Sequence, residues 1–239
     1  MSDHGQDRWA VRCEWGLAGL DAVGEFAEVV IVVDVLSFST CVDVAVSRGA
    51  EIIPAIWRDE RAADLARESS AVLAGKRGEG RYSLSPETFL SAEPGTRVVL
   101  PSPNGATLSA RPHRARVLCG CLRNAASVAR AARGLGKTIA VIPAGERWDD
   151  GSLRPALEDL VGAGAILAGL GNELAPEASA ARETFARFES TLEKTLAECS
   201  SGRELISRGF PSDVELAAQY DVSRSVPLLE GGAFRNLAR

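Results

Sequence analysis

The sequence predicts an α/β fold with three layers, α/β/α, around a mainly parallel or mixed sheet, followed by a helical C-terminal third. Six short apolar runs, most of them rich in β-branched residues, lack polar alternation and are typical of strands covered on both faces. Helix-like segments separate most of these runs, and this alternation favours a largely parallel sheet with helices on both faces. After Pro155 the apolar residues follow a helical period instead.

The predicted elements follow in order along the first two thirds of the chain. The predicted strands are Val29–Leu36, Ile52–Ile56, Ala71–Ala74, Val98–Leu100, Val117–Cys119 and Ile139–Ile142. The predicted helices are Ser37–Ser47, Asp59–Glu68, Asn104–Ala110 and Asn124–Arg133. Glycines at positions 49, 134 and 136 stand where the C-termini of helices are expected.

The C-terminal third reads as several helices that cap or flank the sheet. One begins near Pro155, a residue favoured in the first turn. Residues 177–200 are predicted to form one long amphipathic helix, and its apolar positions are predicted to be core, namely Phe185, Phe188, Leu192 and Leu196. Two shorter helices are expected after it, with Ser201 or Ser212 as N-cap.

Composition limits the function classes. The chain of 239 residues fits one large domain, or two intimately packed lobes at about 1–135 and 136–239. A net charge of -5 gives no general basic field, so we expect neither nucleic acid nor an anionic membrane as a partner. Five cysteines without Cys-x-x-Cys spacing and only two histidines argue against zinc. Without a signal-peptide core or a membrane-length apolar run, we expect a cytoplasmic protein.

The polar residues after each predicted strand are the candidates for a site, because ligands of open α/β sheets bind at the carboxyl ends of strands. Asp34 closes the apolar run "VVIVVDVL", where a carboxylate is costly to bury unless it meets a cation or a hydrogen-bond donor. A cap for the following helix is the alternative for Asp34. Glu146, directly after the sixth strand, is a second such carboxylate.

Cationic and amide side chains follow three of the other strands. Lys76 and Arg77 lie among glycines in "GKRGEGRYSLSPETF", where arginine can hold an anion bidentately, although a plain surface loop is the alternative. Asn104 and Gly105 fall at a helix start whose N–H groups can face an anion, unless they form an ordinary strand–helix turn. The fifth strand ends at another helix start that carries Arg123 and Asn124.

The helix near Pro155 adds two acids. Glu158 and Asp159 lie near its first turn and are expected to face back toward the strand ends, although acids there often only complement the helix dipole. Carboxylates and arginines would then meet at one sheet edge, a combination that suits Mg²⁺ and a phosphate. No P-loop and no Gly-x-Gly-x-x-Gly sequence occurs, which disfavours an NAD-type oxidoreductase.

Several stretches occur in an order that resembles the 2-phosphosulfolactate phosphatase family, from roughly Val29 to Pro227. They include "VVDVLSFSTCVDVAVSRGA", "AGKRGEGRYSLSPETF", "LPSPNGATLSA" and "AGERWDDGSLRPALEDLVGAGAIL". The resemblance implies an α/β fold and Mg²⁺-dependent hydrolysis of 2-phospho-3-sulfolactate to 3-sulfolactate and phosphate, a step toward coenzyme M. It also implies functional roles at Asp34, Arg77, Asn104, Gly105, Asn124, Glu158 and Asp159.

Two departures from the family pattern bear on the substrate. Ser37 stands where the family usually has arginine, and Lys76 stands where it usually has glutamate. The substrate can therefore be another small acidic organophosphate. The alternative is a family member that binds a phosphate or sulfonate anion without turnover.

These observations give a set of expected roles. We expect Asp34, Glu158 and Asp159 to act in catalysis and Asp34, Asp159 and Glu146 to hold Mg²⁺. The expected substrate-binding residues are Lys76, Arg77, Asn104, Gly105, Arg123 and Asn124. The apolar stripe near Phe185 is a possible homodimer interface.

Overall fold

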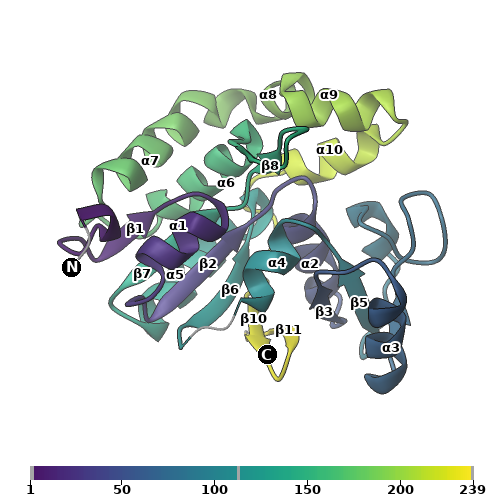
Figure 1. Cartoon of the computed structure of the whole chain (residues 1–239). Coiled ribbons are helices and arrows are strands. Elements are labelled where there is room, and N and C mark those ends of the chain that lie inside the picture. The colour runs from purple at the N-terminus through teal and green to yellow at the C-terminus, as the bar shows by residue number, and fades with distance from the viewer. Residues whose placement is uncertain (1–2, 112–113, 238–239) are drawn as a thin grey trace.

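The computed structural model describes residues 3–111 and 114–237, whose strands form one large mixed sheet (Figure 1). Its strand order is β1 (Val11–Cys13), β7 (Ile139–Pro143), β2 (Val29–Val33), β6 (Arg116–Gly120), β10 (Pro227–Glu230), β11 (Ala233–Asn236), β3 (Glu51–Ala55), β5 (Arg97–Pro101) and β4 (Val72–Leu73). A small separate hairpin consists of β8 (Glu146–Arg147) and β9 (Leu153–Arg154). The α/β prediction with a mixed sheet is confirmed.

The sheet consists of two parallel groups joined by the C-terminal hairpin. Strands β1, β7, β2 and β6 are parallel to one another, as are β3, β5 and β4. Between the groups, β10 pairs antiparallel with β6, and β11 pairs antiparallel with β3. Strands from the two proposed lobes therefore share one sheet, with β7, β10 and β11 lying among strands of the first lobe, while the division into lobes stays a prediction.

Alternate residues of β2 face two different cores, as expected for a strand covered on both faces. Val29, Ile31 and Val33 are buried in one core with residues of α5 (Ala125–Leu135), α6 (Leu157–Ala168) and α7 (Pro176–Phe188). Val30 and Val32 are buried in the other core with residues of α1 (Gly16–Val23), α2 (Phe38–Ser47) and α4 (Gly105–Ala110). The order of layers is therefore helix, sheet, helix.

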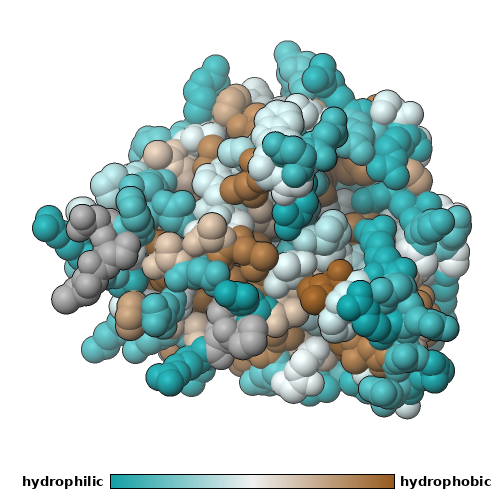
Figure 2. Space-filling model, viewed as in Figure 1, coloured by the Kyte–Doolittle hydropathy of each residue, from teal (hydrophilic) through white to brown (hydrophobic). Residues whose placement is uncertain are grey.

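Helix α3 (Glu60–Glu68) covers the far group of strands and contacts β5. It buries Ala62 and Ala66 and leaves its charged side chains outward. In Figure 2, hydrophilic residues dominate the side of the viewed face on which α3 lies.

The prediction of one long helix over residues 177–200 is wrong. A 3-10 turn, Glu189–Thr191, divides this segment into α7 and α8 (Leu192–Glu198). The division lets α7 pack against α6 while α8 packs against α9 (Ser200–Ser207) and α10 (Pro211–Ala218). Phe185 is buried and contacts the ring of Tyr220, so the apolar stripe lies within the chain and offers little surface to a second copy.

Two further differences concern the ends of the fold. The N-cap of α9 is Cys199, whose Sγ accepts a hydrogen bond from the Gly202 N–H, and α10 begins after Phe210, so neither predicted serine is the cap. The β10–β11 hairpin was also missed. Its turn is Gly231-Gly232, with φ of 55° and 82°, the positive values that a two-residue hairpin turn requires. No helix among residues 3–111 and 114–237 is both long enough and apolar enough to cross a membrane.

Candidate active site

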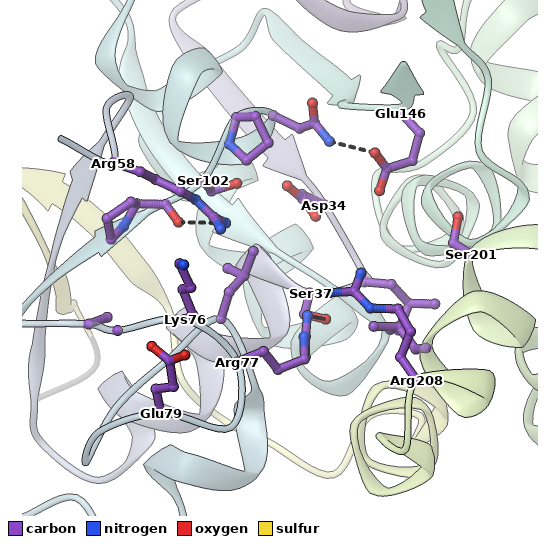
Figure 3. A pocket seen from close by; sticks show the side chains of 18 of the residues that line it. Asp34, Ser37, Arg58, Lys76, Arg77, Glu79, Ser102, Glu146, Ser201 and Arg208 are labelled. Carbon is purple, nitrogen blue, oxygen red and sulfur yellow. Dashed lines mark hydrogen bonds between the residues drawn. The ribbon is translucent and has the colours of Figure 1, made fainter. Parts of the chain in front are cut away.

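A pocket of about 650 Å³ lies where loops from both parallel groups meet (Figure 3). Its lining comes from the loops after β2, β3, β4, β5 and β7, and from α9. The polar residues that line it are Asp34, Ser37, Arg58, Lys76, Arg77, Glu79, Ser102, Asn104, Glu146, Ser201, Glu204 and Arg208. Five of the sequence-predicted site residues are among them, namely Asp34, Lys76, Arg77, Asn104 and Glu146.

Asp34 lies at the wall of this pocket and is only 5% exposed. Its Oδ1 accepts a hydrogen bond from the Phe38 N–H at 3.3 Å, and its Oδ2 accepts one from the Gly105 N–H at 2.7 Å. Burial raises the pKa of Asp34 to about 6, although these two N–H groups oppose the rise. Asp34 therefore caps α2, as its alternative interpretation proposed, and also faces the pocket.

The N–H of Gly105 was expected to bind the substrate, but it has a structural role. Its N–H donates to Asp34, so this N–H is not free to bind a substrate oxygen. A Cβ at this position would lie 2.4 Å from Cδ1 of Phe38 and 2.8 Å from Oδ2 of Asp34, closer than real Cβ contacts allow. The Asn104-Gly105 turn therefore needs glycine because α4 begins directly against Asp34 and Phe38.

Glu146 and Asn104 lie side by side in the pocket. The Asn104 Nδ2–H donates to Oε2 of Glu146 at 3.0 Å. Burial raises the pKa of Glu146 to about 7, and the nearby charge of Asp34 contributes to the rise. The charge of Asp34 thus disfavours the ionised form of Glu146, and a cation between the two carboxyl groups would remove that penalty.

Glu158 and Asp159 are buried at the start of α6, but neither lines the pocket. Asp159 accepts hydrogen bonds from the Val35 N–H at 2.7 Å and the Gly145 N–H at 2.8 Å. It therefore ties together the loops that carry Asp34 and Glu146. Burial raises the pKa of Asp159 well above its ordinary value. Oε2 of Glu158 accepts a hydrogen bond from the Cys199 thiol at 3.4 Å.

The three expected metal ligands are therefore not gathered together. In the described part of the chain, no group of three or more His, Cys, Asp or Glu side chains is arranged to hold a metal ion. Asp34 and Glu146 nevertheless line one pocket. Mg²⁺ is commonly held by one or two carboxylates, with water and substrate phosphate as its other ligands, so this pair fits Mg²⁺ without Asp159.

Arg77 forms the fixed part of the cationic wall. Its guanidinium donates to the buried carboxylate of Asp213 and to Ser37 Oγ, the latter at 3.3 Å, and it lies 5.3 Å from the ring centroid of Phe210. Asp213 also accepts a hydrogen bond from Ser85. These contacts hold the guanidinium in one orientation at the pocket, beside exposed Lys76.

The structure does not place Arg123 or Asn124 in the pocket, so their role in substrate binding stays a prediction without support from this geometry. Arg123 Nε donates to the fully buried Asp43 at 2.8 Å. Asn124 is also buried, and its Oδ1 accepts a hydrogen bond from the Cys121 N–H at 2.9 Å. Both side chains are used to hold the fold.

Comparisons with known proteins identify the family of the chain. The family model described as 2-phosphosulpholactate phosphatase matches residues 19–232. The chain belongs to the 2-phosphosulpholactate phosphatase family. It is 29% identical to the 2-phosphosulfolactate phosphatase of Methanothermobacter thermautotrophicus, over 84% of this chain and 87% of that one. It is 33% identical to a Deinococcus radiodurans protein named "Probable 2-phosphosulfolactate phosphatase", over 87% of this chain and 90% of that one. Family membership places the chain among the phosphoric monoester hydrolases.

Six polar pocket residues of this phosphatase-family chain were not predicted from the sequence, namely Arg58, Glu79, Ser102, Ser201, Glu204 and Arg208. Arg58 and Ser102 follow β3 and β5, so a strict search of strand ends would have found them. Ser201 and Arg208 come from α9 and its C-cap, far along the chain from the other loops. No local pattern marks a helix residue as a pocket residue.

Proposed function

We propose that this chain hydrolyses 2-phosphosulfolactate, or a similar small acidic organophosphate, and that it needs Mg²⁺ to do so. The observation that carries the proposal is one pocket in which the carboxylates of Asp34 and Glu146 face the cationic side chains of Lys76 and Arg77. Figure 3 shows Asp34 and Glu146 on one side of the pocket and Lys76 on the other. Membership of the phosphatase family supports the same reaction.

Asp34 and Glu146 would hold Mg²⁺ at the pocket wall. Bound there, Mg²⁺ would neutralise charge on the phosphate oxygens and favour ionisation of a coordinated water. Asn104 keeps the Glu146 carboxylate in place through its 3.0 Å hydrogen bond. Asp159 acts behind them by fixing the backbone of Val35 and Gly145.

Arg77 would bind the phosphoryl oxygens. Asp213, Ser37 and Phe210 already hold its guanidinium, so little side-chain entropy is lost on binding. Lys76 adds a second positive charge from the same loop. Hydrolysis forms a bond from a water oxygen to phosphorus and breaks the ester P–O bond, releasing sulfolactate and phosphate.

The proposal includes a location and a metabolic role for the protein. A cytoplasmic location and a role on the route to coenzyme M follow from the sequence interpretation and the family resemblance. A homodimer also stays a prediction, although the buried position of Phe185 removes the surface first suggested for it.

Phosphate release from purified protein tests the proposal. We expect turnover of 2-phosphosulfolactate with Mg²⁺, loss of turnover with EDTA, and at least a roughly 100-fold lower kcat for Asp34→Asn. Asp64→Asn is the matched control, because Asp64 forms an exposed ion pair with Arg67 and is not a pocket residue. Equal rates with EDTA and with Mg²⁺ would rule out the metal role. Tight binding of sulfolactate by calorimetry, without hydrolysis of any acidic phosphoester, would favour the non-catalytic anion binder.

A further inference from the structure

The cations that line the pocket differ in whether the fold supplies them with an anion. Arg77 is paired with Asp213, and Arg208 is paired with Glu204 at 3.1 Å. Within residues 3–111 and 114–237, no acidic side chain forms an ion pair with Arg58 or Lys76. These two cationic side chains can therefore pair with an anionic group of a bound ligand.

Arg58 is held in its place by local structure on both sides. It lies between the end of β3 and the start of α3, and the next residue, Asp59, caps α3 by accepting the Arg61 N–H at 3.1 Å. An Nη2–H of Arg58 donates to the Pro101 carbonyl at 3.5 Å, at the end of β5. Arg58 thus reaches across to the strand that leads into Ser102 and Asn104.

The surroundings of Arg58 are unfavourable for a cation in the absence of a ligand. Partial burial lowers the pKa of Arg58, and the charge of Arg77 lowers it further. Arginine stays protonated in proteins, so Arg58 keeps its positive charge despite this electrostatic cost. A bound anion would lower the cost. Figure 3 shows Arg58 beside Ser102 and Lys76, on the side of the pocket away from Glu146.

This position is separate from the proposed phosphate position. Arg77 lies against Ser37 and α10, whereas Arg58 is fastened to the end of β5. A substrate whose only anionic group is a phosphate bound at Arg77 would leave Arg58 without an anion. A substrate with a second anionic group could supply one to Arg58.

We propose that Arg58 is a specificity-determining residue that binds the second acid group of the substrate, a sulfonate or a carboxylate, while Arg77 binds the phosphate. This inference rests on the proposed phosphatase function and deepens it. It means that the enzyme selects phosphomonoesters that carry another anionic group near the ester.

Three substrates of graded charge test it. They are 2-phosphosulfolactate, 2-phospholactate, which lacks the sulfonate, and isopropyl phosphate, which lacks both further acid groups. The readout is the ratio of kcat/KM for 2-phosphosulfolactate to that for isopropyl phosphate. In Arg58→Ala we expect this ratio to fall by about 10- to 100-fold, the effect of one charge-assisted hydrogen bond, mainly through KM.

Arg61→Ala is the matched control. Arg61 is an exposed arginine of the same segment that pairs with Asp59 and does not line the pocket. Its removal changes the net charge equally and should leave the ratio within about twofold. A loss with both 2-phosphosulfolactate and 2-phospholactate assigns the carboxylate to Arg58, and a loss with 2-phosphosulfolactate alone assigns the sulfonate. The inference would be overturned if kcat/KM of Arg58→Ala fell equally for all three substrates, or fell for none of them.

A binding measurement separates this inference from the proposed function. If the wild-type chain releases no phosphate from any of the three substrates, the phosphatase proposal fails while Arg58 remains testable. Calorimetry with 3-sulfolactate should then show binding at least about tenfold weaker for Arg58→Ala than for wild type and Arg61→Ala. Equal affinities in all three proteins would refute the role of Arg58.

Discussion

Asp34 and Gly105 are joined by a hydrogen bond of 2.7 Å from the Gly105 N–H to the Asp34 carboxylate. Asp34 follows β2 in the first parallel group of strands, and Gly105 begins α4 after β5 in the second group. This bond therefore joins the two groups at the wall of the pocket. The same carboxylate also accepts the Phe38 N–H, so the beginnings of α2 and α4 are fixed together.

Gly105→Ala tests this junction. The added Cβ would overlap Phe38 and Asp34, so α4 must shift and the bond to Asp34 must lengthen. We expect a loss of about 1–3 kcal/mol in the free energy of unfolding and a clear loss of activity. Gly134→Ala in α5 is the control, since a Cβ there meets nothing within 4 Å. Urea unfolding of both variants measures the difference, and equal stabilities would contradict the close contact.

Stability should respond to pH and Mg²⁺ together. Asp34 and Glu146 have ordinary pKa values of 3.8 and 4.5 and raised values of about 6 and 7 in the fold. Between these values the folded, metal-free protein binds more protons than the unfolded chain. The free energy of unfolding should therefore fall as pH rises through this window.

Added Mg²⁺ should remove this penalty once both carboxyl groups are ionised. We expect the rise in Tm on adding Mg²⁺ to be larger at pH 8 than at pH 6, because bound ligand stabilises only the folded state. Thermal unfolding at the two pH values, with and without Mg²⁺, measures this rise. It should shrink strongly in Glu146→Gln, and a pH-independent rise of equal size in that variant would place the metal elsewhere.

The buried pair of Arg77 and Asp213 should affect substrate binding as well as stability. Asp213→Asn leaves the Arg77 guanidinium without its carboxylate, so we expect a loss of about 1–3 kcal/mol in stability and a higher KM. Asp64→Asn breaks an exposed pair with Arg67 and should cost only about 0–0.5 kcal/mol. Unfolding curves and steady-state kinetics check both effects. An unchanged KM in Asp213→Asn would show that Arg77 does not need this support.

Arg123→Ala should lower stability without changing substrate binding. Asp43 would keep its hydrogen bonds from Ser223 and Ser225 but lose its cation, and an unpaired buried carboxylate costs about 3–5 kcal/mol. We expect a much lower midpoint in urea with KM within about twofold of wild type in the folded fraction. A large rise in KM without destabilisation would instead support Arg123 as a substrate-binding residue.

The parts of the site that the sequence predicted are those that follow strands directly. Asp34, Asn104 and Glu146 each come within a few residues of a strand end, and the fold brings them into one pocket. Arg123 satisfied the same criterion but does not line the pocket, and its guanidinium pairs with Asp43, 80 residues away in sequence. Arg208 was missed because nothing near it in sequence shows that its helix end borders the pocket.

The sequence by itself determined the alternation of strands and helices, the family, and the strand ends at which polar groups emerge. These features depend on apolar periodicity and turn residues, which act over a few neighbouring positions. Only the tertiary structure decided that Glu146 faces the pocket while Asp159 lies behind it. It alone also showed that Arg58 has no acidic partner among residues 3–111 and 114–237, whereas Arg123 pairs with Asp43. Burial and charge pairing depend on residues distant in sequence, so no local pattern contains them.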